Sequence, residues 1–503
     1  MFDNTSRRDF LRWLSVSGAA LAVPGLLSGP ARAASPDVTV ITHATLIDGT
    51  GARPLRDATV IVVGGHVVWA GAHGHARIPR GATIIDARGK FVLPGLWDMH
   101  THGTAYEDIS IPLYLVNGVT GVREMGGFPW LHAIRERIES GELLGPRMVI
   151  ASNFVDGPIS LMGENAVRVS TVDEARAAVR AEAEGGADLI KVYSYLEAEP
   201  FAAVADEARR LGLPFGGHVP YRSTLPAASD LGQRCFEHLY DLPLSVSRLH
   251  DRLRAELART PLDPADPLAF FLKTRELDRL AAAHYDPRRG AAVFARLVRN
   301  GSWVSPTLTV NRIVSSPASD YVDDPRLEYL PGYIKDPWKG ALARTEPKTP
   351  EQIARQRAYF TDRLRLVGRL HRAGVGVLGG TDCTNPYVVP GFAVHDELEL
   401  LVRAGLSPMA AIQTMTRDAA RFLGQEATAG TVAPGKVADL VVLDADPLAD
   451  IRNTAKVNTV VVRGRVITAD ERLRMLAAVK EAAGRPAPPA SAAALTRPAC
   501  ACF

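Results

Sequence analysis

Two histidines, His100 and His102, stand two positions apart at the end of an apolar run. In a β-strand, residues i and i+2 face the same side, so both imidazoles can reach one metal ion. Such a pair taken by itself is more often structural than metal-binding. It gains weight here because other residues that can bind metals end later apolar runs of the chain.

Three of these residues are His218, His238 and Asp382. Any one of them is more often a hydrogen-bonded core or loop residue than a ligand. Together, imidazoles with one carboxylate form a ligand set that suits zinc, and an open coordination position would hold a water molecule with a pKa of about 7. The pattern therefore predicts a metal-dependent hydrolytic site.

Lys191 is the unusual member of the set, because it lies inside the apolar run 189–193. A lysine in a buried strand is costly unless its charge is paired or removed. One explanation is an ion pair with Asp188 or Glu237, which the lysine taken alone favours. The other is carboxylation by carbon dioxide, which gives a carbamate anion able to bridge two metal ions.

The elements that position these residues are short apolar runs that alternate with helical patterns, such as those at 173–184 and 201–211. Repeated strand-helix units favour an α/β fold of the (β/α)₈ (TIM) barrel type, whose active sites lie at the carboxyl ends of the strands. A doubly wound sheet is the alternative, but no glycine-rich phosphate loop follows any strand. The expected strands are 120–123, 147–152, 189–193, 214–218, 234–238, 303–307 and 375–382.

The barrel is expected over residues 94–424. Two stretches within it, at about 241–301 and 313–351, exceed ordinary barrel loops and are interpreted as insertions able to form a lid. The β-rich segments 34–93 and 425–470 are predicted to pair into one flanking β-sandwich. Residues 471–503 are expected to form a helix and a disordered Ala- and Pro-rich tail, and Cys500 and Cys502 in it are given no role.

Residues 1–33 have the pattern of a twin-arginine signal peptide, in which Arg7 and Arg8 precede the apolar run 13–27 and a small-residue cleavage site. The run is too short and too broken by glycine and proline to be a stable membrane anchor. We therefore expect export through the twin-arginine machinery to the periplasm or beyond. Lys and Arg number 58 against 55 Asp and Glu, a balance that suggests no nucleic-acid partner.

Three motifs, at 90–102, 379–382 and 430–443, resemble the amidohydrolase superfamily, and the resemblance covers nearly the whole mature chain. The sequence is most similar to the branch of imidazolonepropionase-like proteins and prolidase-type dipeptidases. The resemblance implies a (β/α)₈ barrel with a flanking β-sandwich and a metal centre at the strand ends. Imidazolonepropionase resembles a one-metal member without the bridging lysine, so Lys191 argues against that activity.

The resemblance also implies a role for each residue. His100 and His102 would bind the first of two divalent ions, and His218 and His238 the second. Lys191, carboxylated by carbon dioxide, would bridge them. Asp382 would be a ligand and the general base and acid, while a hydroxide shared by the ions attacks an amide-type bond.

The substrate is expected to be a small molecule with a C–N bond, such as an N-acyl amino acid or a dipeptide. Tyr193, Tyr221, Arg222 and His395 are weaker candidates for substrate contacts, each as often packing or solvated surface. Glu124, where an aspartate is common, and the sequence after His218 depart from the dipeptidase pattern and put that substrate in doubt. The alternatives are a cyclic amide or lactone hydrolase and a non-catalytic periplasmic metal-binding protein.

Overall fold

The computed structural model describes residues 38–486 except residues 105 and 344. The predictions made for the signal peptide 1–33 and for the tail beyond residue 486, with Cys500 and Cys502, lie outside the described residues. Within the described part, no helix has both the length and the apolar character that a membrane span requires.

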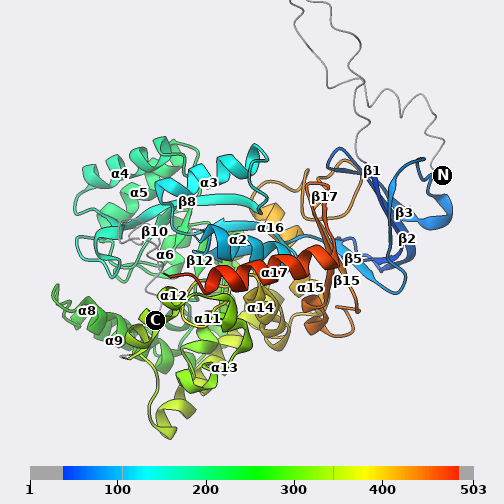
Figure 1. The fold of residues 1–503 in the computed structure, drawn as a ribbon. Helices are drawn as coiled ribbons and strands as arrows, with labels where there is room; N and C mark the ends of the chain where they lie inside the picture. The colour runs from blue at the N-terminus through cyan, green and yellow to red at the C-terminus, as the bar shows by residue number, and fades with distance from the viewer. Residues whose placement is uncertain (1–37, 105, 344, 487–503) are drawn as a thin grey trace, which may run out of the picture. The chain divides into compact units, whose positions relative to one another are not determined.

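Eight strands of a nine-stranded parallel sheet form the centre of the barrel (Figure 1), and the ninth, the short strand β9 (Ala166–Arg168), pairs with β8. The ends of the barrel sheet meet through backbone hydrogen bonds, in which Met99 N–H donates to Gly379 O over 3.0 Å and Asp382 N–H donates to His100 O over 2.7 Å. The predicted (β/α)₈ barrel is therefore confirmed. In chain order, the strands are β6 (Leu96–Thr101), β7 (Val119–Glu124), β8 (Arg147–Asp156), β10 (Leu189–Val192), β11 (Phe215–Gly217), β12 (Cys235–Glu237), β13 (Trp303–Ser305) and β14 (Gly376–Val377).

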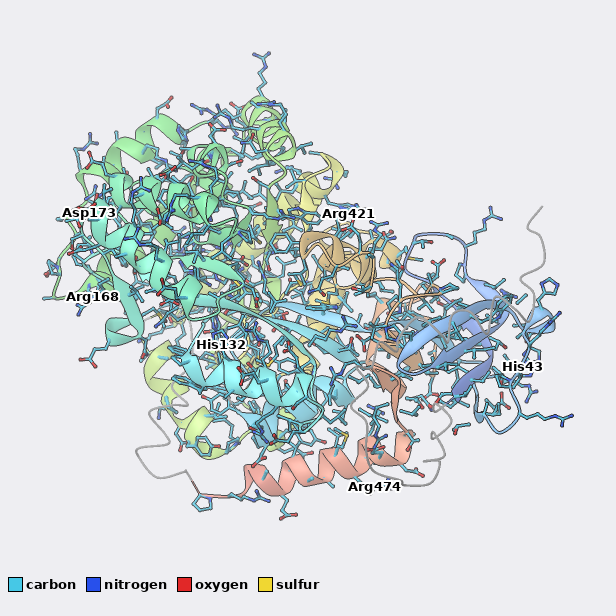
Figure 2. All side chains as sticks on the ribbon, turned by 90° about the horizontal axis from the view of Figure 1, so that it is seen from above. His43, His132, Arg168, Asp173, Arg421 and Arg474 are labelled. Atoms are coloured by element: carbon cyan, nitrogen blue, oxygen red, sulfur yellow. The ribbon has the colours of Figure 1, made fainter. Side chains whose placement is uncertain are left out.

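Helices connect these strands and cover the outer face of the sheet. Their starts are well specified: Thr171 caps α4 and Thr349 caps α13 with reciprocal capping boxes. The connecting helices are α2 (Glu107–Val116), α3 (Pro129–Glu139), α4 (Val172–Glu184), α5 (Ala198–Arg210), α6 (Leu225–Asp230), α10 (Pro287–Arg299) and α13 (Pro350–Arg372), followed by α14 (Phe392–Arg403), α15 (Pro408–Thr414) and α16 (Arg417–Phe422). His132 on α3 and Asp173 on α4 mark this outer layer in Figure 2.

The barrel core lies between the strands and these helices. It contains side chains such as Ile190, Val304 and Leu366, which are almost fully buried. Successive side chains along a strand point alternately toward the helices and into the barrel. Lys191, between the core residues Ile190 and Val192, therefore faces the interior of the barrel.

The stretch 241–301 is only partly an insertion, because its last helix, α10, is the ordinary helix that leads into β13. The additional elements are α7 (Leu242–Ser245), α8 (His250–Arg259) and α9 (Pro267–Ala282). The second stretch adds α12 (Gly332–Leu342) and short 3₁₀ turns between α11 (Leu308–Ile313) and α13.

A second, eight-stranded sheet combines strands from both ends of the described chain, as predicted (Figure 1). Its central strand β5 pairs with β1 on one side and with β15 on the other. One residue, Gly95, separates β5 from β6, so the first barrel strand continues directly from this sheet. The strands are β1 (Val38–Leu46), β2 (Leu55–Val63), β3 (His66–Ala72), β4 (Thr83–Asp86), β5 (Phe91–Pro94), β15 (Leu440–Leu443), β16 (Val457–Val462) and β17 (Arg465–Ile467).

The chain then forms helix α17 (Ala469–Ala483), which packs along α2 of the barrel. The helix expected at the start of the segment 471–503 thus begins two residues before it.

Candidate metal centre

The barrel places all six predicted ligands at the carboxyl ends of its strands. His100 lies near the end of β6, Lys191 lies within β10, and Asp382 follows β14. His218 and His238 come directly after β11 and β12. All of these side chains, and that of His102, are at most 5% exposed.

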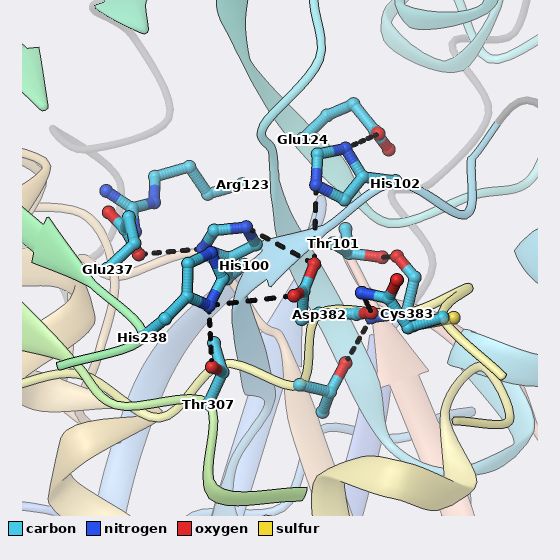
Figure 3. A network of polar contacts seen from close by, with 12 residues as sticks. His100, Thr101, His102, Arg123, Glu124, Glu237, His238, Thr307, Asp382 and Cys383 are labelled. Carbon is cyan, nitrogen blue, oxygen red and sulfur yellow. Dashed lines mark hydrogen bonds and ion pairs between the residues drawn. The ribbon is translucent and has the colours of Figure 1, made fainter. Parts of the chain in front are cut away.

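Three histidines surround the Asp382 carboxylate (Figure 3). His102 Nε2 lies 3.4 Å and His100 Nε2 3.5 Å from Oδ1, while His238 Nδ1 lies 3.6 Å from Oδ2. These distances exceed those of good hydrogen bonds. Ligand atoms of His100, His238 and Asp382 all lie within 4.8 Å of one another, which is close enough for one ion.

Several buried polar atoms of this cluster have no hydrogen-bond partner among the described residues. They are Nε2 of His100, Nε2 of His102, both carboxylate oxygens of Asp382 and Nζ of Lys191. Buried polar atoms are nearly always bonded, because leaving one without a partner costs about 1–3 kcal/mol. These nitrogen atoms and the carboxylate lie close together without hydrogen bonds between them, which fits a site that binds metal ions.

Outer partners fix the orientation of His100. Its Nδ1 donates to Glu237 Oε2 over 2.7 Å, and Arg123 Nη2 donates to Glu237 Oε1 over 2.9 Å. Arg123 also donates from Nε to the Met99 carbonyl over 2.6 Å. Because Nδ1 carries the proton in this arrangement, Nε2 is left as the metal-binding nitrogen.

Two of the other three histidines, His218 and His238, have hydroxyl partners. His218 Nδ1 lies 2.7 Å from Ser194 Oγ, and His238 Nδ1 lies 2.8 Å from Thr307 Oγ1. His238 and Thr307 both have a positive φ, at 61° and 45°, so this hydrogen bond joins two residues in an uncommon backbone conformation. Such strain is frequent where side chains are held for function.

Burial favours the neutral form of the four imidazoles. Burial lowers the pKa of His100, His218 and His238 well below its usual value, and the nearby Lys191 and other cations lower it further. Burial also lowers the pKa of His102, against the raising effect of Asp382. A neutral imidazole is the form that binds a metal ion.

Lys191 is not paired as the ion-pair explanation expects. Asp188 instead pairs with Arg135 over 2.7 Å, and Glu237 bonds to Arg123 and His100. Lys191 Nζ lies 5.6 Å from the centre of the Phe154 ring. Burial lowers the pKa of this lysine to about 8.

Asp98 supports the loop that carries Asp382. It accepts hydrogen bonds from the Thr381 backbone N–H over 2.9 Å and from the Thr381 hydroxyl over 2.6 Å. Burial raises the pKa of Asp98 to about 7. This contact joins the end of β6 to the residue before Asp382, so both parts of the centre share one support.

The four weaker candidates for substrate contacts lie in different surroundings. The Tyr193 ring stacks on His218 with the centroids 4.0 Å apart, and Tyr221 lies on the loop after β11. Arg222 is exposed, with Nε 3.8 Å from Glu197 Oε1. His395 does not join the cluster: it lies on α14, and its Nδ1 is 3.1 Å from Thr454 Oγ1.

The sequence did not indicate the supporting roles of Glu237, Arg123 and Thr307. Arg123 stands in an apolar strand as Lys191 does, and the same argument about buried charge applied to it. Glu237 adjoins His238 in the chain but supports His100, a pairing that only the curvature of the barrel creates.

A small cavity adjoins the centre. The loops after β11 and β12 form one side of it, and helices α8 and α9 form the other. The extra helices of the first insertion therefore border this cavity, and the lid expected from the sequence stays a prediction.

Comparison with known proteins gives a consistent result. A family model described as the Amidohydrolase family matches residues 325–468. An imidazolonepropionase from Aromatoleum aromaticum is 26% identical over 415 residues, which cover 79% of this chain and 88% of the relative. An N-acyl-D-aspartate deacylase from Alcaligenes xylosoxydans is 32% identical over 161 residues, 28% of this chain and 32% of that protein.

Solved structures agree with the fold. A bottromycin amidohydrolase superposes with a TM-score of 0.68 at 25% identity, covering 89% of this chain and 91% of its own. A putative prolidase from Bifidobacterium longum has a TM-score of 0.61 at 25% identity, covering 89% and 99%.

Proposed function

We propose, from the premise that this chain belongs to the amidohydrolase superfamily, that it is an exported two-metal hydrolase of N-acyl amino acids or dipeptides. The family and the relatives identify a hydrolase that acts on carbon–nitrogen bonds of a small molecule. The observation that carries the finer proposal is the cluster of buried atoms without hydrogen-bond partners around Asp382.

The residues divide between two positions. His100, His102 and Asp382 would hold one ion, and His218 and His238 would hold the other, with Lys191 between them as a carbamate. The closeness of His238 to His100 and Asp382 fits two positions that lie side by side. The neutral imidazoles and the carboxylate suit zinc. When bound, such ions make water more acidic and polarise a carbonyl oxygen.

The chain's own groups then direct the reaction. The outer partners Glu237 and Thr307 keep His100 and His238 in fixed orientations. Asp382 accepts the proton of the attacking water and returns it to the leaving nitrogen. The buried setting excludes bulk water from these groups.

Lys191 would be carboxylated by direct reaction with carbon dioxide. The neutral amine attacks the carbon of carbon dioxide, a nitrogen–carbon bond forms, and the amine proton passes to solvent. The product is an anion with two oxygen ligands. The absence of a partner on Nζ among the described residues, and the engagement of Asp188 and Glu237 elsewhere, support this state over a simple ion pair.

Metal content and turnover test the proposal together. Elemental analysis of the purified protein is expected to give two zinc equivalents per chain, and a chelator is expected to remove activity that added zinc restores. A panel of N-acyl amino acids, dipeptides, hydantoins and lactones separates linear amides from the cyclic amide and lactone alternative. Bound metal without hydrolysis of any member of the panel would support the non-catalytic binding protein, against which the relatives argue.

A Lys191→Ala variant tests the bridge. We expect one ion or fewer per chain and activity reduced by at least about 100-fold, with partial recovery on addition of short carboxylic acids. Lys339→Ala, at an exposed position of α12, is the matched control and should behave as wild type. Two ions and full activity in Lys191→Ala would refute the bridging role.

Export rests on the sequence of residues 1–33. Replacing Arg7 and Arg8 by lysine is expected to retain the protein in the cytoplasm, as measured by fractionation of the producing cells. Unchanged export of this variant would contradict a twin-arginine route.

A further inference from the structure

The cavity beside the metal centre lies where helices α8 and α9 of the insertion meet the loops that carry His218 and His238. Its polar lining residues are Tyr221, Tyr240, Asp241, Arg254, Thr274, Arg275 and Asp278. Charged groups are rare in such buried walls unless they have a partner or a ligand.

Tyr240 connects this cavity with the metal centre. The centroid of its ring lies 4.7 Å from that of His218 and 5.1 Å from that of His238. On the cavity side, the guanidinium carbon of Arg275 lies 4.6 Å from the same ring. A single aromatic ring therefore separates this cation from two predicted metal ligands.

Arg275 is held in one orientation. Its Nη1 donates to Asp278 Oδ2 over 3.0 Å, its Nη2 donates to Tyr359 Oη over 3.2 Å, and its plane is packed on Tyr240. These bonds use two of the five N–H donors of a guanidinium. A fixed guanidinium with donors to spare is suited to recognising a planar anion.

The cavity has a second guanidinium, that of Arg254, which forms an ion pair with Asp241 and donates to the Ser223 carbonyl over 3.1 Å. Its buried Nε has no hydrogen-bond partner among the described residues, and neither has Oδ1 of Asp278. Asp241 in turn accepts from the Leu225 N–H and the Ser245 hydroxyl, each over 2.7 Å. Asp241 is therefore fully engaged, and an incoming anion would meet two guanidinium groups and one carboxylate oxygen, Oδ1 of Asp278, without a partner among the described residues.

We propose that Arg275 binds the carboxylate of the substrate, so that the enzyme selects amides and peptides with a free carboxylate close to the scissile bond. This inference rests on the proposed hydrolase function. In an N-acyl amino acid, three bonds separate the carbonyl carbon that is attacked from the carboxylate carbon, a span of about 3.5 Å. A carboxylate so close to the scissile bond must be bound near the metal centre, and Arg275 contacts the same ring that packs on His218 and His238. Arg222, in contrast, is exposed and lies beside Glu197.

The experiment compares N-acetyl-L-alanine with N-acetyl-L-alaninamide, which differ only in the charge of the terminal group. In the zinc-loaded wild type, kcat/KM is expected to be higher for the acid. In Arg275→Gln, kcat/KM for the acid should fall by about 100-fold, while that for the amide should change by less than about threefold. Arg275→Lys keeps the charge and should recover part of the loss, and Arg259→Gln, exposed on α8, is the control.

Calorimetric titration of both compounds into the zinc-loaded protein separates this inference from the proposed function. If the wild type cleaves neither compound but binds the acid more tightly, and Arg275→Gln abolishes that difference, the carboxylate site stands and the reaction assigned above is wrong. If both compounds lose activity or affinity by the same factor, Arg275 has only a structural role and the inference is overturned. The double variant Arg275→Gln/Asp278→Asn leaves no buried unpaired acid and repeats the test should the single variant fold poorly.

Discussion

Glu237→Gln tests whether the metal centre depends on a buried partner that is not itself a ligand. The wild-type carboxylate accepts one hydrogen bond from His100 and another from Arg123. A glutamine replaces one of the two carboxylate oxygens by an NH₂ group, which cannot accept, so one side of this double contact loses its acceptor. If the remaining oxygen serves Arg123, the NH₂ group faces His100 Nδ1 and favours the tautomer in which Nε2 carries the proton and cannot bind metal.

Glu237→Gln is expected to lower two quantities, the affinity for zinc and the free energy of unfolding. Loss of an outer partner of a metal-binding histidine typically weakens metal affinity 10–100-fold, or about 1.4–2.8 kcal/mol. The side chain of Arg123 is fully buried, and breaking a buried ion pair costs about 3–5 kcal/mol of stability. Zinc affinity is measured by competition with a chromogenic chelator, and stability by denaturant unfolding of the metal-free protein.

Glu207→Gln is the matched control, since Glu207 is also a buried acid paired with arginines, but on α5, outside the barrel. It should lower the melting temperature and leave zinc affinity unchanged. Equal zinc affinity in Glu237→Gln and wild type would refute the argument that Glu237 selects the tautomer of His100. An equal loss of affinity in the control would show that the effect is one of general stability.

Three further predictions concern other parts of the chain. At Gly217, φ is 128° and a Cβ would lie 2.2 Å from a main-chain oxygen of β10. We expect Gly217→Ala to lower the free energy of unfolding, measured with denaturant, by at least about 3 kcal/mol, and the control Gly212→Ala, which has open space around it, to lower it by about 1 kcal/mol. Similar losses in the two variants would count against the clash. Thr307→Val removes the hydroxyl on His238 and should weaken zinc binding about 3–10-fold in the chelator assay, and unchanged binding would exclude this support. The arginines bonded to Glu207 lower the pKa of this acid to about 2, so the stabilising contribution of its charge is present above pH 4.5 and is lost as the pH falls toward 2. The difference in melting temperature between wild type and Glu207→Gln should therefore narrow over that range. A constant difference would argue against ionic stabilisation.

The barrel and the positions of the six predicted ligands could be read from the sequence because strand ends are local features. His100 and His102 mark one strand end, and each later ligand follows its own apolar run. The repeated unit then determines which edge of the sheet they share.

The supporting contacts could not be read in the same way, because they depend on which strands become neighbours across the barrel. Arg123 and Glu237 are 114 positions apart and meet only when the sheet closes. His395 illustrates the converse, since its helix presents it to Thr454 rather than to the barrel interior. The stretch 241–301 was interpreted as an insertion because it exceeds an ordinary barrel loop. Its last part is nevertheless the ordinary helix α10, which follows α8 and α9 without an intervening strand.

The direct continuation of β5 into β6 has a consequence for the order in which the molecule can assemble. β5 completes its pairing only with β15, a strand from residues 440–443, which are synthesised long after His100. Pairings between such distant segments form slowly, because the intervening chain must first be ordered. A chain that ended before residue 440 would contain every predicted ligand and still lack the strand that anchors the start of β6. Stable metal binding in this protein would then require that synthesis has passed residue 443.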